Sequence, residues 1–215
     1  MNGATGIFGG TFDPVHFGHL RAASEVKELL GIDDFRLFPA GMPPHRDSTH
    51  AHGDHRLAML RLAVADHPDL AVDDREIRRQ GASYMVDTLI DLRAEAGDRP
   101  LLLIVGQDAA NQLDEWHRWK ELFELTHIVI MTRPSAAHDY SAELGNSLDG
   151  RIVEHSQQLF DQPAGLVLHL NVTQLAISSS NIRNLISRGI SPRFLLPDRV
   201  LAYAQYHDLY LENED

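Results

Sequence analysis

Near the amino terminus, two glycines and two histidines stand in an order that can bind phosphate. The segment reads Gly9-Gly10-Thr11-Phe12-Asp13-Pro14-Val15-His16-Phe17-Gly18-His19. Gly9 and Gly10 carry no side chain, so the backbone can turn sharply and a phosphate can approach its N–H groups. His16 and His19 have the spacing of side chains that share one face of a helix. The pattern predicts two imidazoles and a ring of amides that bind phosphates and stabilise charge on a transferring phosphorus.

The two histidines also have a plain structural explanation, because such rings cap helices or pack beneath them. For an isolated pair at this spacing, that explanation is the better one. Here the pair follows an apolar run, Ala4–Phe8, and the turn residues Asp13 and Pro14. A helix that begins at this point presents free N–H groups and its positive dipole end to an anion, which favours the phosphate site.

A second group of phosphate-binding side chains lies toward the other end of the chain. It reads Ile177-Ser178-Ser179-Ser180-Asn181-Ile182-Arg183. Hydroxyls at a helix amino terminus can donate to phosphate oxygens, and Arg183 lies one turn into the helix on the face of Ser179 or Ser180. A serine-rich N-cap with an incidental arginine is the alternative. Together with the histidine motif, the segment favours a second part of one phosphate site.

These groups need a scaffold, and the hydrophobic pattern predicts one. The predicted strands are 4–8, 35–39, 101–105, 127–132 and 166–170 with a short one in 70–78, and the predicted helices are 17–30, 54–65, 84–95, 179–187 and 197–206 with a short one around 122. Alternating strands and helices predict an α/β fold, a Rossmann-like doubly wound, mostly parallel sheet with helices on both faces. Ligands bind such folds at the carboxyl ends of the strands. We expect one domain, residues 1–215, with Pro134–Gly165 as irregular surface elaboration.

Local signals also predict where some helices begin and end. Asp54 is expected to cap the helix that runs through Ala65, and Ser83 the helix that begins at Tyr84. Gly97 is expected to end the latter helix.

The composition excludes several classes of protein. The chain has 215 residues, a formal net charge of −12 and no cysteine. An acidic balance argues against broad nucleic-acid binding, which needs basic surface. The lack of cysteine excludes a disulfide framework and fits a reducing compartment. Neither a signal peptide nor a long apolar stretch is recognisable, so we expect a cytoplasmic protein without membrane or nucleic-acid partners.

The two motifs resemble the two signatures of the HxGH nucleotidyltransferase superfamily, whose members transfer AMP or CMP to a phosphate. Ser180 stands where that superfamily usually has threonine, and the hydroxyl is retained. The resemblance is closer to the bacterial nicotinate-nucleotide adenylyltransferases and covers nearly the whole chain. Three further stretches carry it: Pro43-Pro44-His45-Arg46, Ser83-Tyr84-Met85-Val86-Asp87-Thr88-Leu89, and Gly106-Gln107-Asp108 followed by Trp116.

This resemblance implies transfer of AMP from ATP to nicotinic acid mononucleotide, with Mg²⁺ as cofactor and with nicotinic acid adenine dinucleotide and pyrophosphate as products. His16 and His19 would be catalytic, Asp108 would bind ribose hydroxyls, and Trp116 would stack on the pyridine ring. The expected ATP and phosphate residues are Gly9, Gly10, Thr11, Phe12, Gly18, Arg46, Gly106, Ile177, Ser178, Ser180 and Arg183. The expected mononucleotide residues are Tyr84, Met85, Thr88, Asp108, Trp116, His117 and Arg133.

Two departures from the family bear on the acceptor. Met85 stands where relatives commonly place a threonine that helps to hold the pyridine carboxylate, and Ala40 stands where some carry asparagine. Main-chain N–H groups near Met85 and His117 can still bind that carboxylate, so the acid is favoured and nicotinamide mononucleotide is the competitor. Other open alternatives are a transferase for pantetheine phosphate or a CTP-dependent substrate, and a non-catalytic nucleotide sensor. The oligomeric state stays open, a homo-oligomer included.

Further histidines follow the second predicted strand. His45, His50, His52 and His55 stand close together in the sequence, and His50 with His52 can in principle hold a metal. A solvated polar loop is the favoured explanation, so we expect no dedicated metal site. The polar and proline content of Gly41–Gly53 makes it a candidate lid.

Overall fold

A seven-stranded sheet lies within the residues that the computed structural model describes, 3–41, 49–132 and 139–211. Its strands are β1 (Thr5–Gly10), β2 (Asp34–Pro39), β3 (Ala71–Val72), β4 (Leu101–Gly106), β5 (His127–Thr132), β6 (Ile152–Val153) and β7 (Val167–Asn171). They are ordered β3-β2-β1-β4-β5-β7-β6. The pairs β1–β4, β4–β5, β5–β7 and β6–β7 are parallel.

The strand order is that of a doubly wound Rossmann-like sheet. The order runs outward from β1 in both directions, first through β2 and β3 and then through β4 and β5. Crossovers between parallel strands are almost always right-handed, so those on the two sides of β1 place their helices on opposite faces of the sheet. Ligands bind such sheets where the order reverses, which is at the carboxyl end of β1. The predicted fold class is confirmed.

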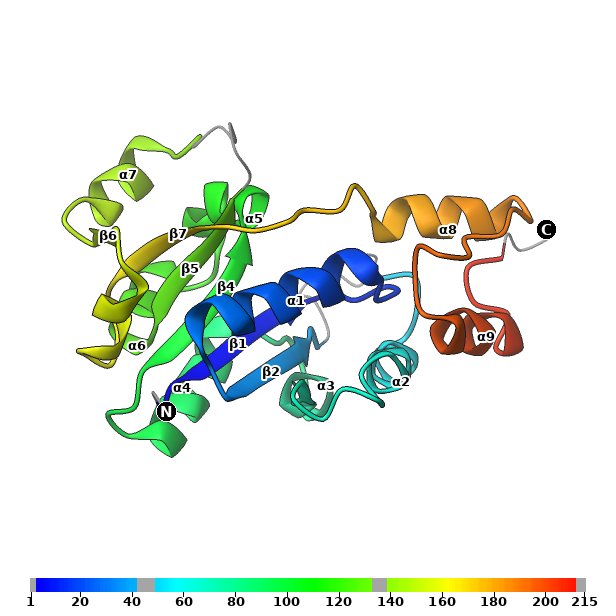
Figure 1. Ribbon diagram of the computed structural model, residues 1–215, viewed down its shortest axis with the longest axis horizontal. Helices are drawn as coiled ribbons and strands as arrows, with labels where there is room; N and C mark the ends of the chain where they lie inside the picture. Colours follow the sequence, from blue (N-terminus) through cyan, green and yellow to red (C-terminus); the bar gives the residue numbers. More distant parts are fainter. Residues whose placement is uncertain (1–2, 42–48, 133–138, 212–215) are drawn as a thin grey trace. The chain divides into compact units, whose positions relative to one another are not determined.

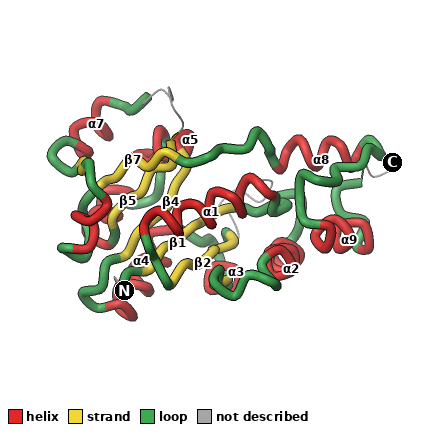
Figure 2. Tube along the Cα trace, viewed as in Figure 1, coloured by secondary structure: helices red, strands yellow, loops and turns green. Residues whose placement is uncertain are grey.

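The helices alternate with the strands along the chain (Figures 1 and 2). They are α1 (Phe17–Leu30), α2 (Gly53–Ala63), α3 (Arg75–Arg78), α4 (Met85–Ala96), α5 (Gln107–Asn111), α6 (Leu122–Leu125), α7 (Ala142–Leu148), α8 (Ser179–Ser187) and α9 (Asp198–Tyr206), with single-turn helices at Leu113–Glu115, Trp119–Glu121 and Ser156–Phe160. No helix in the described ranges is long and apolar enough to cross a membrane.

Contacts divide the chain into two compact units, each with its own core. Unit 1 comprises Met1–Gly9, Glu25–Arg36 and Tyr84–Thr173, and unit 2 comprises Gly10–Ser24, Leu37–Ser83 and Gln174–Asp215. Buried aliphatic side chains of β1, β4, β5 and β7 form the core of unit 1. The core of unit 2 includes buried side chains of α2 and α9 with two phenylalanines, Phe12 and Phe38. The single domain expected from the sequence stays a prediction.

Two predicted helix starts are wrong by one or two residues. The N-cap of α2 is His52 rather than Asp54, because the His52 ring accepts a hydrogen bond from the Asp54 N–H at 3.4 Å. Asp54 instead lies in the first turn, where its charge favours the helix dipole. The N-cap of α4 is Tyr84 rather than Ser83. Gly97 does end α4, with a φ of 59° that favours glycine.

Other elements also depart from the sequence prediction. Helix α2 ends at Ala63, short of the expected Ala65. The short strand predicted within 70–78 has only two residues, β3, and the short helix α3 follows it. The described part of Pro134–Gly165 contains α7 and the edge strand β6, although it was expected to be irregular. Strand β6 has two residues, too few to show an alternating pattern.

Candidate active site

The segment between β1 and α1 folds back on itself because of a glycine and an unusual backbone conformation. Phe12 is 1% exposed and has a φ of 50°, in the left-handed region that side-chain-bearing residues rarely adopt. A Cβ atom added at Gly10 would lie 3.0 Å from the Phe12 ring. Gly10 therefore gives the Phe12 ring room to pack under the loop. Strained backbone of this kind is concentrated at functional sites.

Both predicted catalytic histidines lie together in unit 2. The rings of His16 and His19 stack with centroids 3.8 Å apart. The Phe12 and His19 rings pack edge to face, with centroids 5.0 Å apart and an interplanar angle of 75°. A Cβ atom at Gly18 would lie 2.9 Å from the His16 ring. A side chain at position 18 would thus collide with the His16 ring, so the stacked pair needs glycine there.

Burial keeps both imidazoles neutral near pH 7. It lowers the pKa of His16 to about 4, and burial together with the neighbouring His16 lowers the pKa of His19 to about 3. The main-chain N–H of His16 donates to Nδ1 of His19 at 3.4 Å, which assigns the proton of the neutral His19 ring to Nε2. Within the described residues, Nδ1 of His16 is buried without a hydrogen-bond partner. The protonated Nε2 of His19 and the unpaired Nδ1 of His16 are therefore ring nitrogens that can contact an anion.

The lowered pKa values predict a specific titration. In the ligand-free protein, we expect histidine NMR signals to titrate with midpoints of about 4 for His16 and about 3 for His19. Unfolded histidines titrate near about 6.5. As pH falls below that value, the unfolded chain binds protons first, so these two residues cost stability as the pH falls toward their folded pKa values. A midpoint near 6.5 for either ring would contradict the buried, neutral pair.

The amino terminus of α8 is tied to the same loop within unit 2. Arg183 donates through Nη1 to the main-chain oxygen of Asp13 at 2.7 Å and through Nη2 to Oγ of Ser180 at 3.2 Å. Ser178 caps the helix by accepting from the N–H of Asn181 at 3.2 Å. The sequence left Ser179 and Ser180 open as partners of Arg183, and the structure has Ser180.

One of the three serine hydroxyls has a different task from the one expected. Ser179 Oγ donates to the main-chain oxygen of Pro14 at 2.9 Å. Its proton is thus directed at the loop and not toward a ligand. Ser178 and Ser180 are exposed and keep hydroxyls that can meet phosphate.

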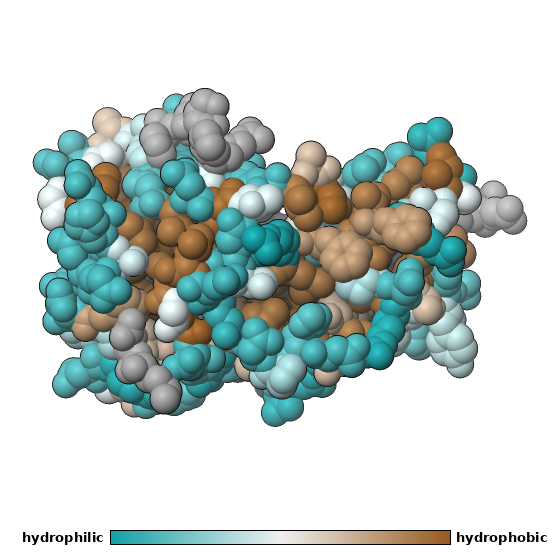
Figure 3. Space-filling model, viewed as in Figure 1, coloured by the Kyte–Doolittle hydropathy of each residue, from teal (hydrophilic) through white to brown (hydrophobic). Residues whose placement is uncertain are grey.

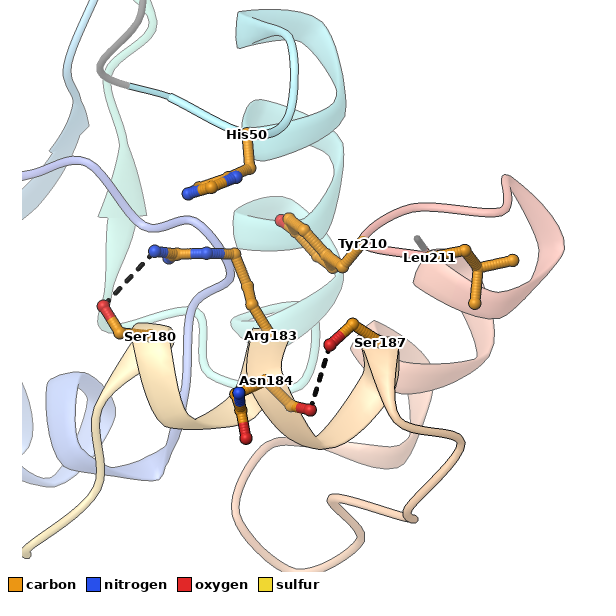
Figure 4. Close-up of a pocket in the computed structure, with 7 residues that line it drawn as sticks. All are labelled: His50, Ser180, Arg183, Asn184, Ser187, Tyr210 and Leu211. Atoms are coloured by element: carbon orange, nitrogen blue, oxygen red, sulfur yellow. Dashed lines mark hydrogen bonds between the residues drawn. The ribbon is translucent and has the colours of Figure 1, made fainter. Parts of the chain in front are cut away.

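A pocket lies beside Arg183 (Figure 4). It has a volume of about 360 Å³ and is lined by His50, Ser180, Arg183, Asn184, Ser187, Tyr210 and Leu211. The guanidinium of Arg183, the imidazole of His50 and the hydroxyls of Ser180, Ser187 and Tyr210 contribute polar groups to its lining, beside the apolar side chain of Leu211. Such donors can bind an anion. Ser180, Arg183, Asn184 and Ser187 lie on one face of α8, the spacing expected of a helical turn.

Two buried charged residues support the loop, and sequence reasoning missed both. Asp13 is 3% exposed and accepts from the main-chain N–H groups of His50 at 2.7 Å and Ala51 at 3.2 Å. Arg56 is 2% exposed and donates to main-chain oxygens of Thr11 at 2.8 Å, Gly41 at 3.3 Å and Ala51 at 3.2 Å. A signal for Arg56 was present, since it stands at helical spacing from buried residues of α2.

Most of the predicted mononucleotide residues lie in unit 1. The Tyr84 ring faces the His117 ring, with centroids 4.3 Å apart. Met85 is half-buried at the start of α4, and a Cβ atom at Gly9 would lie 2.6 Å from its Cε. The structure thus brings Gly9, at the carboxyl end of β1, together with Met85.

A further group follows β4 in the same unit. Gly106 is the N-cap of α5, and a Cβ atom added there would meet open space, so the surface above it is free for a ligand. Asp108 is exposed in the first turn of α5, and Trp116 is half-buried. Thr88 is fully buried on α4. The binding roles of these residues stay predictions.

Some predicted residues cannot be placed or have another task. Arg46, together with Pro43, Pro44 and His45, and Arg133 lie outside the described residues. The same holds for most of the candidate lid. His52 caps α2, and Nδ1 of His55 lies 3.0 Å from the hydroxyl of Tyr203. Among the residues that the structure describes, there is no group of three side chains suited to a metal ion.

Comparison with known proteins gives consistent matches. The model of the cytidylyltransferase-like family matches residues 7–185. A protein of Hahella chejuensis named probable nicotinate-nucleotide adenylyltransferase is 48% identical over 206 residues, which cover 95% of this chain and 94% of the relative. A protein of Methylococcus capsulatus with the same name is 49% identical over 206 residues, which cover 95% of this chain and 98% of the relative.

A solved structure has the same fold. It is Plasmodium falciparum nicotinic acid mononucleotide adenylyltransferase complexed with NaAD. The TM-score is 0.72, the sequence identity is 15%, and the match covers 96% of this chain and 97% of that chain. At this low sequence identity, the structural similarity shows that the two proteins share a fold.

Proposed function

The chain belongs to the cytidylyltransferase-like family and, within it, to the nicotinate-nucleotide adenylyltransferases, and on that premise we propose that it transfers AMP from ATP to nicotinic acid mononucleotide. The products are nicotinic acid adenine dinucleotide and pyrophosphate, so the reaction is a step in NAD biosynthesis. The observation that carries the proposal is the stacked pair of His16 and His19 beside the loop that Arg183 binds.

The reaction is a direct displacement at phosphorus. An oxygen of the mononucleotide 5′-phosphate attacks the α-phosphorus of ATP in line and forms a new P–O bond. The bond from the α-phosphorus to the oxygen that bridges to the β-phosphorus breaks, and pyrophosphate leaves with that electron pair. No protein nucleophile is needed, so positioning and electrostatic stabilisation supply the catalysis.

Unit 2 supplies the groups for the triphosphate. His16 and His19 bind the transferring phosphate, and His19 stabilises the transition state by donating from Nε2. An anion raises the pKa of a nearby imidazole, so a bound triphosphate strengthens both rings as donors. Arg183 meets the other phosphates with a fixed positive charge, and Ser178 and Ser180 donate from their hydroxyls. Arg46 belongs to this set by sequence.

Unit 1 supplies the groups for the mononucleotide. Trp116 stacks on the pyridine ring, as an indole can with a flat heteroaromatic ring. Asp108 accepts hydrogen bonds from ribose hydroxyls. Main-chain N–H groups near Met85 and His117 donate to the pyridine carboxylate. Arg133 meets the 5′-phosphate. Because β1, α1 and β2 each begin in one unit and end in the other, we propose that residues 1–215 act as one nucleotidyltransferase domain.

Mg²⁺ is the proposed cofactor, together with ATP as substrate. The buried carboxylate of the loop, Asp13, already accepts from two main-chain N–H groups and from the Tyr210 hydroxyl. It is therefore occupied by the protein's own donors. The loop therefore fits an ion that would be held mainly by substrate and water, as proteins commonly bind Mg²⁺. When bound, the ion would neutralise charge on the triphosphate.

A cytoplasmic location stays a prediction of the sequence.

The acceptor preference tests this assignment of unit 1. We expect kcat/KM for nicotinic acid mononucleotide to exceed that for nicotinamide mononucleotide by about 10- to 100-fold, because hydrogen bonds to a charged group are worth about 1.5–3 kcal/mol. The measurement is pyrophosphate release with each acceptor at saturating ATP and Mg²⁺. The Met85→Thr variant adds a hydroxyl and should widen the preference for the acid.

Equal or reversed preference in the wild type would keep the adenylyl transfer but contradict the acid as acceptor, and Met85 would then be the residue to examine. Release with neither pyridine mononucleotide would overturn the proposed function. Pantetheine phosphate is then the next acceptor to test.

A further inference from the structure

The carboxyl-terminal segment of unit 2 contacts the loop that carries the catalytic histidines. Tyr210 follows α9 and is half-buried. Its hydroxyl donates to Oδ1 of Asp13 at 2.7 Å, although the two residues are 197 positions apart in the chain. Figure 4 shows the Tyr210 ring with its hydroxyl end directed toward the side chains of His50 and Arg183.

Asp13 joins three segments of unit 2 at one buried residue. Its carboxylate accepts from the N–H groups of His50 and Ala51, in the segment before α2, and from Tyr210 after α9. Its main-chain oxygen accepts from Arg183 on α8. A shift of Asp13 therefore moves the acceptor that fixes Arg183, the proposed phosphate-binding cation.

The charge of Asp13 is balanced within the same cluster. Burial lowers the pKa of Arg56, and the nearby carboxylate of Asp13 opposes that effect. Arg56 itself is committed to main-chain oxygens of Thr11, Gly41 and Ala51. The Asp13 carboxylate receives a side-chain hydrogen bond from the Tyr210 hydroxyl, at 2.7 Å.

We propose that Tyr210 is a positioning residue of the phosphate site, which acts through Asp13 on Arg183. This inference rests on the proposed function. Without the hydroxyl, the Asp13 carboxylate keeps its two main-chain donors and loses the short hydrogen bond from Tyr210. Losing a hydrogen bond to a buried charged group is costly. Asp13 then turns toward other donors or water, and the guanidinium of Arg183 loses the geometry in which it meets the ATP phosphates.

The chemistry of Tyr210 suits a permanent donor. Burial and the neighbouring Asp13 carboxylate raise the pKa of the Tyr210 phenol above its ordinary value. The Tyr210 hydroxyl therefore keeps its proton at neutral pH and well above it. A donor that does not titrate can hold Asp13 in one arrangement.

The variant Tyr210→Phe removes this donor and keeps the ring. We expect KM for ATP to rise about tenfold, as for a lost hydrogen bond to a charged group. We expect kcat and KM for the mononucleotide to stay unchanged, since the mononucleotide residues lie in unit 1. Calorimetric titration with ATP and Mg²⁺ alone should show the same loss of affinity.

Tyr203→Phe is the matched control. The Tyr203 hydroxyl lies 3.0 Å from Nδ1 of His55, so this variant also removes a tyrosine hydroxyl contact from unit 2 without touching Asp13. We expect it to lower the melting temperature and leave the affinity for ATP unchanged. A merely structural role of Tyr210 predicts the same pattern for Tyr210→Phe, namely lower stability with unchanged KM for ATP.

The outcomes separate this inference from the proposed function. If Tyr210→Phe binds ATP as tightly as the wild type, or if Tyr203→Phe weakens ATP equally, the positioning role is wrong. If the wild type binds ATP and forms no dinucleotide, the proposed function is wrong, and the comparison of ATP affinities still tests Tyr210. Should Tyr210→Phe fail to fold, Asp13→Asn tests the same link and should weaken ATP binding selectively.

Discussion

Replacing His19 with alanine is expected to lower kcat about 10²- to 10³-fold with both substrates saturating, the usual cost of losing one donor to a transition-state oxyanion. His19 stacks on His16, and its Nδ1 accepts from the main chain, so Nε2 is the atom that carries the donated proton. Stabilisation by Nε2 should matter most when charge develops on the transferring phosphate. The loss should therefore fall on kcat more than on KM for ATP.

His67→Ala is the control for this variant. His67 is an exposed histidine of unit 2, and its replacement should leave kcat unchanged. Steady-state pyrophosphate release measures both variants. Near-normal turnover of His19→Ala would remove His19 from the catalytic machinery.

Arg183→Ala is expected to lower kcat/KM for ATP about 100-fold, because a hydrogen-bonded charge that meets a phosphate contributes about 1.5–3 kcal/mol. Arg183 is anchored on both sides, to the oxygen of Asp13 and to Ser180. The Arg183→Ala variant therefore removes a positive charge that these two hydrogen bonds hold in a fixed position.

Two further variants sharpen this result. Arg183→Lys should restore little of the activity, since one ammonium group cannot reproduce the two anchoring contacts of the planar guanidinium. Arg188→Ala removes an exposed arginine at the C-cap of α8 and should keep normal kcat/KM for ATP. A loss at Arg188 as large as that at Arg183 would point to general charge and not to a specific phosphate contact.

The strong local signals of the sequence predicted the helices of the site well. Helices α1 and α8 have the predicted bounds, Phe17–Leu30 and Ser179–Ser187, because apolar spacing and a cap define each of them within a few residues. The strands β1, β4 and β5 were found from short apolar runs. The stacked histidines follow from the spacing of the motif and from Gly18.

The contacts that support the site could not be read from the sequence. Asp13 was interpreted as a turn residue, yet its carboxylate is bound by Tyr210 from near the other end of the chain. Local patterns carry no information about such distant pairs. In the same way, the choice between Ser179 and Ser180 as partner of Arg183 depends on which hydroxyl faces Pro14. Only the folded arrangement decides that.

The surface of the protein carries both polar and apolar residues. Figure 3 shows polar residues over much of the visible face, with apolar residues gathered in two areas, one at the left over unit 1 and one near α8. Exposed apolar side chains of unit 2 include Leu175, Ile190 and Phe194. Single exposed apolar residues are common in folded proteins, so they add nothing to the assignment of the site.

The most direct test of the adenylyl transfer is the amount of dinucleotide formed for each pyrophosphate released, measured in one reaction with ATP, Mg²⁺ and nicotinic acid mononucleotide. We expect equal amounts of pyrophosphate and nicotinic acid adenine dinucleotide at every time point, and neither product without the mononucleotide. Pyrophosphate release without dinucleotide, or no release with the mononucleotide present, would show that the protein does not catalyse this adenylyl transfer.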